Sequence, residues 1–137
     1  MRYYFAPMEG LTDSIYRKTH NKYFSGVDAY YMPFISPTVH RCLTNREARE
    51  VPFADTVKFR AVPQLMTKVA EDFLWAAQEC KNRGYDEVNL NVGCPSGTVV
   101  AKKKGAGMWR IRISWTVFWM RFLKNPRCPF PLRPGWV

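Results

Sequence analysis

A cysteine stands where a predicted strand meets a loop rich in glycine and lysine. In residues 86–108, DEVNLNVGCPSGTVVAKKKGAGM, three apolar residues alternate with Asn89 and Asn91, which is the period of a β-strand. A Gly-Cys-Pro sequence ends this strand abruptly and places Cys94 at its carboxyl end. A thiol beside carboxamides can take part in proton transfer, although a lone cysteine in a turn is more often a small buried residue. From these residues alone, both interpretations are open.

Four strands that alternate with helices would position this cysteine. We predict strands at the start of residues 3–10 and over residues 27–32, 61–66 and 87–92, and a short polar helix over residues 44–50. A helix capped by Thr12 or Asp13 follows the first strand. A second helix, over residues 67–83 and ended by Gly84, follows the third strand.

This alternation, with short connections, indicates an α/β fold built from parallel βα units. Four strands are half of an eight-stranded β/α barrel, which normally needs about 250 residues. Pro7, Gln64 and Cys94 each lie at or just past the carboxyl end of a predicted strand, where barrels place their chemistry. From the pattern alone, an open α/β sheet fits nearly as well.

The composition indicates one ordinary domain with an uneven charge distribution. The 137 residues are 47% hydrophobic and carry a net charge of +10. Residues 1–108 hold 15 Lys and Arg against 11 Asp and Glu, whereas residues 109–137 hold six Lys and Arg and no acid. The four cysteines form no CxxC pair, and we find no signal peptide or long apolar span. We therefore expect a reduced cytoplasmic setting and no membrane partner. The two histidines stand apart, so no metal is expected.

Three motifs in this order resemble the tRNA-dihydrouridine synthases, flavin enzymes that reduce uridine in tRNA. They are APMEGLTD at residues 6–13, PQL at residues 63–65, and NLNVGCPSGTVVAKKKGAG at residues 89–107. Each motif alone is weak, and it is their combination, spread over residues 1–108, that is specific. The resemblance selects the barrel over the open sheet. We expect residues 1–108 to form the N-terminal half, about four βα units, of a (β/α)8 TIM barrel.

The resemblance also implies a cofactor, a substrate and roles for site residues. It implies that FMN contacts Pro7, Met8, Glu9 and Gln64, that Asn91 lies against the flavin and the uracil, and that Cys94 is the general acid. Reduction of the uracil C5–C6 bond needs a hydride at C6, which no side chain can supply; reduced flavin would carry it, and NADPH would reload the flavin. A thiol suits the protonation of C5, since an unperturbed thiol is mostly protonated at neutral pH. Gln64 and Asn91 have a plainer alternative, because carboxamides also satisfy buried backbone groups.

The three consecutive lysines of the loop also have two interpretations. Lys102, Lys103 and Lys104 could form an ordinary solvated charge run. In an enzyme that acts on tRNA, a flexible basic loop beside the acid would instead hold phosphates and clamp the substrate. On that second interpretation the three lysines bind tRNA, whose target base must leave its stack to reach a barrel mouth.

Residues 109–137 differ from the rest in composition and do not resemble the family. They contain four of the five tryptophans and four of the ten prolines. An apolar basic segment can indicate a membrane-surface helix, but a shifted reading frame explains this one better. With permissible codons, the frame that starts at the third base of the Trp109 codon encodes ADPDILDRFLDAIFEKSPMPISVKTRV, which contains a helix start, an amphipathic helix and a strand. We therefore expect a lost nucleotide near the Met108 codon and a poorly ordered tail.

A half barrel would lack parts that the family draws from later strands: the lysine of the hidden VKTR segment, further flavin contacts and a helical tRNA-binding domain. We therefore expect this polypeptide to bind FMN weakly or not at all and to be inactive. The family resemblance implies a monomer, whereas an open half barrel would expose the edge of its fourth strand and apolar helix faces, which favours self-association. Two other functions stay open: a different barrel flavoenzyme that reduces a free pyrimidine, and a non-catalytic protein whose basic tail binds RNA or a membrane surface.

Overall fold

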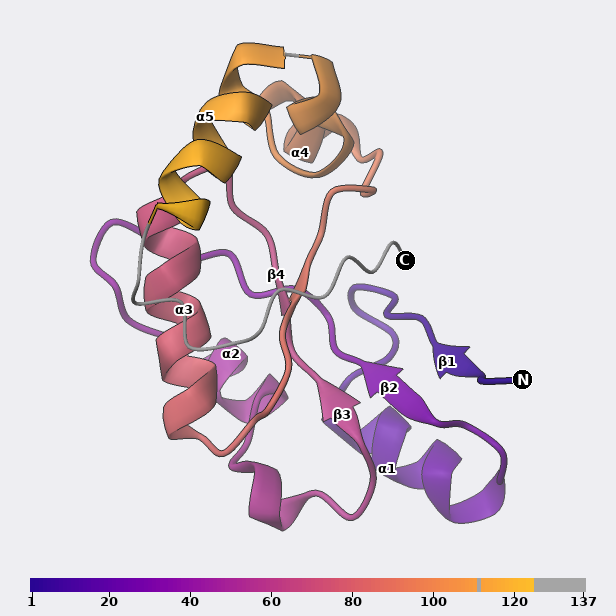
Figure 1. Cartoon of the computed structure of the whole chain (residues 1–137). Coiled ribbons are helices and arrows are strands. Elements are labelled where there is room, and N and C mark those ends of the chain that lie inside the picture. Colours follow the sequence, from indigo (N-terminus) through magenta and orange to yellow (C-terminus); the bar gives the residue numbers. More distant parts are fainter. Residues whose placement is uncertain (111, 125–137) are drawn as a thin grey trace.

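Short strands alternate with helices, and the computed structural model describes residues 1–110 and 112–124 (Figure 1). The strands are β1 (Tyr4–Phe5), β2 (Ala29–Tyr31), β3 (Ala61–Val62), β4 (Gln64–Leu65) and β5 (Asn89–Leu90). The α-helices are α1 (Ser14–Tyr23), α2 (Asn45–Glu50), α3 (Ala70–Asn82), α4 (Gly97–Ala101) and α5 (Arg112–Leu123), and the 3-10 turns are η1 (Ala54–Thr56) and η2 (Gly105–Arg110). The predicted α/β class is therefore confirmed.

All strand pairs are parallel, and the strand order follows the chain. β1 pairs with β2 and β2 with β3, while β4 pairs with β5. Only Pro63 separates β3 from β4. The Met32 N–H donates to the Val62 carbonyl (2.9 Å), and the Asn89 N–H donates to the Pro63 carbonyl (2.9 Å). Residues 61–65 therefore act as one interrupted strand between β2 and β5, so each strand lies beside its sequence neighbour.

The structure contains the predicted strands and helices, and its strands are shorter than predicted. β2 lies within the predicted range 27–32, β3 and β4 within 61–66, and β5 within 87–92. The predicted end of α3 is confirmed in detail. Gly84 has φ +88°, the Gly84 N–H donates to the Lys81 carbonyl, and the Tyr85 N–H donates to the Cys80 carbonyl. These two bonds make a Schellman motif, in which glycine supplies the left-handed residue.

Capping side chains fix the start of α1 and of α2. Asp13, rather than Thr12, caps α1, because its Oδ1 accepts the Tyr16 N–H at 2.7 Å. The short polar helix predicted over residues 44–50 is α2, whose N-cap Thr44 and third residue Glu47 exchange hydrogen bonds in a capping box. Thr12 is buried and binds the preceding turn instead.

The main hydrophobic core lies between α3, the strands and α5 (Figure 1). The apolar side of α3 has the predicted helical spacing: Phe73, Ala76, Ala77 and Cys80 are all buried. Leu65 of β4 is fully buried beneath this side. The helix therefore covers the strand that precedes it, as in a βα unit.

The segment from residue 109 on, expected to be poorly ordered, contains α5. Phe118 and Phe122 are buried, one helical turn apart, and both rings contact Phe73 of α3 edge-on, at 6.1 and 5.3 Å. Arg121 also reaches Glu71 of α3, with 3.5 Å between Nη1 and Oε1. These contacts pack α5 against α3, and the expectation of poor order stays a prediction. The prediction for residues 125–137 lies outside the described residues.

Candidate active site at the carboxyl ends of β4 and β5

Three carboxamides lie on one face of the β4–β5 pair. Gln64 is only 5% exposed and lies opposite Asn89 in the strand register. Its Nε2 donates to Asn89 Oδ1 at 2.9 Å, and its Oε1 accepts from Asn91 Nδ2 at 2.8 Å. Asn89 and Asn91 share this face because they are two residues apart, Asn89 in β5 and Asn91 just past its end. The structure therefore brings together Gln64 and Asn91, two of the predicted site residues.

Asn91 also shapes the turn that carries the cysteine. Its Oδ1 accepts the backbone N–H of Cys94 at 3.0 Å and that of Gly93 at 3.2 Å. One side chain thus joins β4 through its amide nitrogen and folds the turn after β5 through its oxygen. These contacts are those of a carboxamide that satisfies backbone groups, which is the plainer interpretation of Asn91. The role of Asn91 as a ligand of flavin and uracil stays a prediction.

Burial separates the cysteines of the described residues. Cys94 is half-buried, Cys42 is exposed, and Cys80 is buried in the core. Burial raises the pKa of the Cys80 thiol to about 12. Cys80 therefore has a structural environment, whereas Cys94 lies at a strand end beside polar groups, where a substrate could reach it.

Two glycines allow the loop to fold back onto Cys94. The Ala106 N–H donates to the Cys94 carbonyl at 3.0 Å. A Cβ on Gly105, which has φ +52°, would lie 2.8 Å from that same carbonyl oxygen, and a Cβ on Gly107 would lie 2.7 Å from the Val100 carbonyl oxygen. The Gly-Ala-Gly sequence is therefore a packing requirement of the loop around the thiol.

The three lysines of the loop have different environments. Lys102 and Lys103 are exposed, as phosphate-binding side chains would be. Lys104 is half-buried and donates from Nζ to Ser36 Oγ at 2.8 Å. Burial, more than the nearby Lys102 and Lys68, lowers the pKa of Lys104. Lys104 thus tethers the loop after β5 to the segment after β2, and only two of the lysines match the expectation of a solvated basic loop.

The turn of Pro7, Met8 and Glu9 follows β1 and is held from the α1 side. The Met8 N–H donates to Thr12 Oγ1 at 2.8 Å, and its carbonyl accepts the Thr12 N–H at 3.0 Å. Glu9 pairs with Arg46 of α2. Met8 is 54% exposed and Pro7 is half-buried. These contacts are to Thr12 and Arg46 and not to the carboxamide cluster. The FMN roles predicted for this turn therefore stay predictions.

Sequence reasoning did not assign roles to Asn89, Ser36 and Arg17. The alternation of Asn89 with apolar residues carried a signal, because the same period that selected Asn91 places Asn89 beside it. Arg17 is 1% exposed and donates to the Thr12 carbonyl (2.7 Å) and the Glu50 carbonyl (2.8 Å). Burial lowers its pKa, against the opposing effect of Glu50. A single arginine in a helix gives no sequence signal for such a role.

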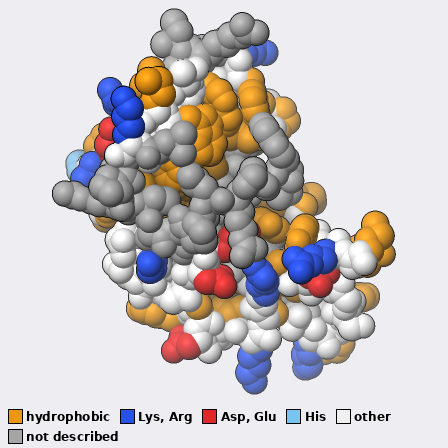
Figure 2. All heavy atoms as spheres, in the orientation of Figure 1, with side chains coloured by type: hydrophobic (Ala, Val, Ile, Leu, Met, Phe, Trp, Pro, Cys, Tyr) orange, Lys and Arg blue, Asp and Glu red, His pale blue; other side chains and the backbone are white. Residues whose placement is uncertain are grey.

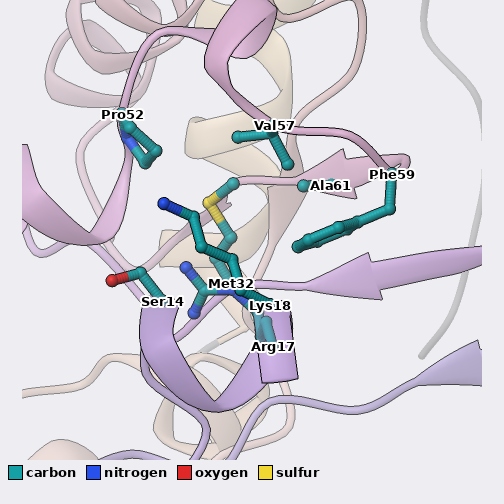
Figure 3. Close-up of a pocket in the computed structure, with 8 residues that line it drawn as sticks. All are labelled: Ser14, Arg17, Lys18, Met32, Pro52, Val57, Phe59 and Ala61. Atoms are coloured by element: carbon teal, nitrogen blue, oxygen red, sulfur yellow. The ribbon is translucent and has the colours of Figure 1, made fainter. Parts of the chain in front are cut away.

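A small hollow lies between α1 and the segment that leads into β3 (Figure 3). It encloses about 200 Å³, open mouth included, and is lined by Ser14, Arg17, Lys18, Met32, Pro52, Val57, Phe59 and Ala61. No predicted site residue lines this hollow. We therefore place the candidate site at the strand ends and not here.

The carboxamide cluster has the chemistry to contact the polar edge of a flavin ring. An amide NH2 has two donors and its oxygen two acceptor positions, so Gln64 keeps one of each beyond its bonds to Asn89 and Asn91. Across residues 1–110 and 112–124, there is no group of three or more His, Cys, Asp or Glu side chains that could hold a metal ion. The same residues contain no helix long and apolar enough to cross a membrane.

Two comparisons with known proteins match this chain. Residues 4–112 match the family model described as dihydrouridine synthase (Dus). A tRNA-dihydrouridine(20/20a) synthase of Vibrio parahaemolyticus serotype O3:K6 (strain RIMD 2210633) is 53% identical over 36 residues. Those residues are 26% of this chain and 11% of that relative, so the match covers about a tenth of the relative's length.

Proposed function

This chain belongs to the dihydrouridine synthase family, and from that premise we propose that it is part of a tRNA-dihydrouridine synthase that uses FMN and NADPH. The observation that carries the proposal is the double role of Asn91. Its side chain bonds to Gln64 at 2.8 Å and to the backbone N–H of Cys94 at 3.0 Å, so one residue links the carboxamide pair to the turn that carries Cys94. An acid and a polar surface for a planar ring are what reduction of a uracil needs.

In this proposal the residues divide the work of holding and protonating the uracil. FMN, when bound and reduced by NADPH, supplies a hydride to C6. Pro7, Met8, Glu9 and Gln64 would hold the flavin, and Asn91 would contact the flavin and the uracil. Cys94 donates its proton to C5, which makes it a general acid and not a nucleophile.

The described strands and helices make four βα units, which supports half of a (β/α)8 barrel over an open doubly wound sheet. In a barrel the strand order follows the chain, whereas in an open doubly wound sheet it reverses at a switch point. β1, β2 and β3 form one sheet in that order, β4 pairs with β5 in a second, and Pro63 joins β3 to β4, so neighbouring strands follow the chain. α1 follows β1, α2 follows β2, α3 follows the β3–β4 segment, and the short α4 follows β5.

We also propose that the sequence after Met108 arose by a change of reading frame. The family match ends at residue 112, close to the expected boundary at residues 108 and 109. A helix in this position is also what the alternative frame encodes, and α5 packs on α3 as a neighbouring barrel helix would. Four strands do not close a barrel, so a polypeptide of these 137 residues has no synthase activity by itself.

In tRNA binding, we propose that the exposed Lys102 and Lys103 contact phosphates while Lys104 holds the loop. The exposure of the first two and the bond from Lys104 to Ser36 support this division. If only two of the three lysines bind phosphates, RNA binding releases fewer counterions than binding through all three would. The affinity for RNA should then depend less on the salt concentration. Charge removal at Lys102 should therefore weaken binding without disturbing the loop.

The test of the proposed function is an assay of two polypeptides. The 137-residue chain, mixed with FMN, NADPH and tRNA, should form no dihydrouridine. A version with one nucleotide restored near the Met108 codon and the downstream source frame included should be active on tRNA and inactive on free uracil. In that version Cys94→Ala should lower kcat by roughly 10²–10⁴-fold and leave FMN affinity unchanged. Full activity of Cys94→Ala, or turnover of uracil with tRNA inert, would contradict the proposal.

A further inference from the structure

The loop that carries Cys94 is anchored at both of its ends. At its start, Asn91 joins the turn of Cys94 to Gln64 of β4. At its end, Lys104 donates from Nζ to Ser36 Oγ at 2.8 Å, across 68 residues of the sequence. The segment after β2 that contains Ser36 also lies beside β4. The second anchor therefore leads to the same strand as the first.

Ser36 and the residue before it are fixed by contacts outside the loop. The Ile35 N–H donates to the Gln64 carbonyl at 2.8 Å, and the Met66 N–H donates to the Ile35 carbonyl at 2.8 Å. The Ser36 N–H donates to Glu47 Oε1 of α2 at 3.1 Å, and Ser36 Oγ donates to the Met66 carbonyl at 3.3 Å. Because the hydroxyl proton is used in this way, the oxygen can accept from an ammonium. Ser36 is therefore a preformed acceptor at the end of β4.

Lys104 extends this anchor to the cysteine through the residues that follow it. The Ala106 N–H donates to the Cys94 carbonyl at 3.0 Å. Gly105 lies so close that an added Cβ would be 3.1 Å from the Cys94 Cβ. The Lys104 N–H also donates to the Val99 carbonyl at 3.1 Å, which joins it to α4. A shift of Lys104 would therefore move the backbone that packs on Cys94.

Stability alone explains the contact between Lys104 and Ser36 poorly. Within residues 1–110 and 112–124, Lys104 makes no ion pair with a carboxylate, and burial lowers the pKa of its ammonium. Desolvation of an ammonium costs free energy, and an uncharged hydroxyl returns only part of it. On the face drawn in Figure 2, Lys and Arg side chains are spread over the surface, so charge alone does not distinguish one lysine. The main consequence of the contact is geometric, because it fixes where the loop ends.

We propose that Lys104 and Ser36 are positioning residues for Cys94. Together they hold the end of the loop on β4, so that the thiol keeps one position relative to the carboxamides of Gln64 and Asn91. Neither residue touches the substrate in this proposal, and α2 supports the anchor from outside. The inference rests on the proposed function, because the position of the thiol matters for proton transfer only if Cys94 is the acid.

The contact is tested by the rate at which iodoacetamide alkylates Cys94 in the whole 137-residue chain, read by peptide mass mapping. Ser36→Ala removes the acceptor without a change of charge, and Lys104→Met removes the donor. Each variant should raise the rate roughly threefold to tenfold, because the loop opens more often when the bond is lost. The double variant should do no more than either single one, since the same contact is lost in all three. Lys104→Arg keeps a donor and should restore most of the wild-type rate.

Three controls separate this contact from charge and from unfolding. Lys102→Met removes the same charge from an exposed position of the same loop and should leave the rate within about twofold. Cys42 is exposed and reports on the reagent in every variant. Cys80 is buried and reports on unfolding of the chain. We expect the labelling rates of Cys42 and Cys80 to stay at their wild-type values.

A second measurement connects the contact to the proposed reaction. In the version with the restored frame, Ser36→Ala should lower kcat roughly tenfold and leave KM for tRNA little changed. Lys104→Arg should keep most of the wild-type kcat. Full synthase activity of Ser36→Ala would overturn the positioning role and leave the proposed function intact. An inactive restored version would overturn the proposed function itself, whatever the alkylation rates.

Three results of the alkylation experiment would overturn the proposal. Unchanged labelling of Cys94 in Ser36→Ala and Lys104→Met, or additive effects in the double variant, would mean that this contact does not hold the loop. An equal effect of Lys102→Met would identify charge as the cause. Faster labelling of Cys80 to the same degree would mean that the contact serves stability and not position.

Discussion

The loop around Cys94 and the turn around Met8 both follow parallel strands, yet they are held in different ways. The Cys94 loop is fixed by Asn91, by the backbone of Ala106 and by two tightly packed glycines. The Met8 turn has one buried partner, Thr12, and its other side is exposed. The turn of the proposed acid is therefore fixed mainly by its own segment, whereas the proposed flavin turn depends on Thr12 and on an exposed ion pair between Glu9 and Arg46.

This difference indicates which functions a partial barrel can keep. A geometry set by contacts within one βα unit survives when other units are missing, as with Asn91 and Cys94. A cofactor site that draws residues from several strands does not, because each strand supplies only part of the surface. We therefore expect the Cys94 loop to keep its conformation in this chain, and flavin affinity to be weak or absent.

The largest expected effect comes from alanine substitution at matched glycines in the two regions. Gly105 and Gly10 both have positive φ, +52° and +81°, so alanine adds similar backbone strain at each. At Gly105 the new Cβ would also lie 2.8 Å from the Cys94 carbonyl oxygen, whereas at Gly10 nothing lies within 4 Å. We expect Gly105→Ala to lower the free energy of unfolding by about 2–3 kcal/mol and Gly10→Ala by about 1 kcal/mol.

Urea unfolding followed by tryptophan fluorescence measures both values. The control is Gly97→Ala, because Gly97 starts α4 with open space around it and an ordinary φ. That variant should change the free energy of unfolding by less than about 0.5 kcal/mol. Equal losses at Gly105 and Gly10 would mean that the loop around Cys94 is no more tightly packed than the Met8 turn.

An intermediate effect is expected from Asn91→Ala, which removes the bonds to Gln64, Gly93 and Cys94. Gln64 is buried, so its freed acceptor is poorly solvated, and we expect a loss of about 2 kcal/mol. Iodoacetamide labelling of Cys94, read by peptide mass mapping, should become faster as the turn loosens. The control Gln78→Ala removes an exposed amide bond to Asn82 and should change neither value appreciably. Unchanged labelling in Asn91→Ala would show that Asn91 does not set the turn.

Local signals in the sequence predicted much of this fold. Period-two alternation located Asn89 in β5 and Asn91 just past it, helical spacing gave the buried side of α3, and Gly84 marked the end of α3. These features depend on residues close together in the chain. They could be predicted because propensity and spacing act within one element.

Features that join distant segments were missed because they carry no local pattern. Arg17 binds Glu50, 33 residues away, and Lys104 binds Ser36, 68 residues away. The burial of Phe118 against Phe73 is similar: the composition of the tail separated it from the rest of the chain and gave no signal that α5 would pack on α3. Such contacts follow from how elements meet in space, which a single sequence does not encode at fixed spacings.

The smallest expected change in the free energy of unfolding comes from a substitution at the Met8 turn. Thr12→Val keeps the side-chain shape and removes the hydroxyl that binds the Met8 N–H at 2.8 Å and the Met8 carbonyl at 3.2 Å. Water can replace this partner because the turn is exposed on its outer side, so we expect a loss of at most about 1 kcal/mol. Hydrogen exchange at the Met8, Leu11 and Thr12 amides should rise while the amides around Cys94 keep their protection. Thr12→Ser should restore the wild-type values, and faster exchange around Cys94 as well would mean that the two regions are coupled and that the comparison between them fails.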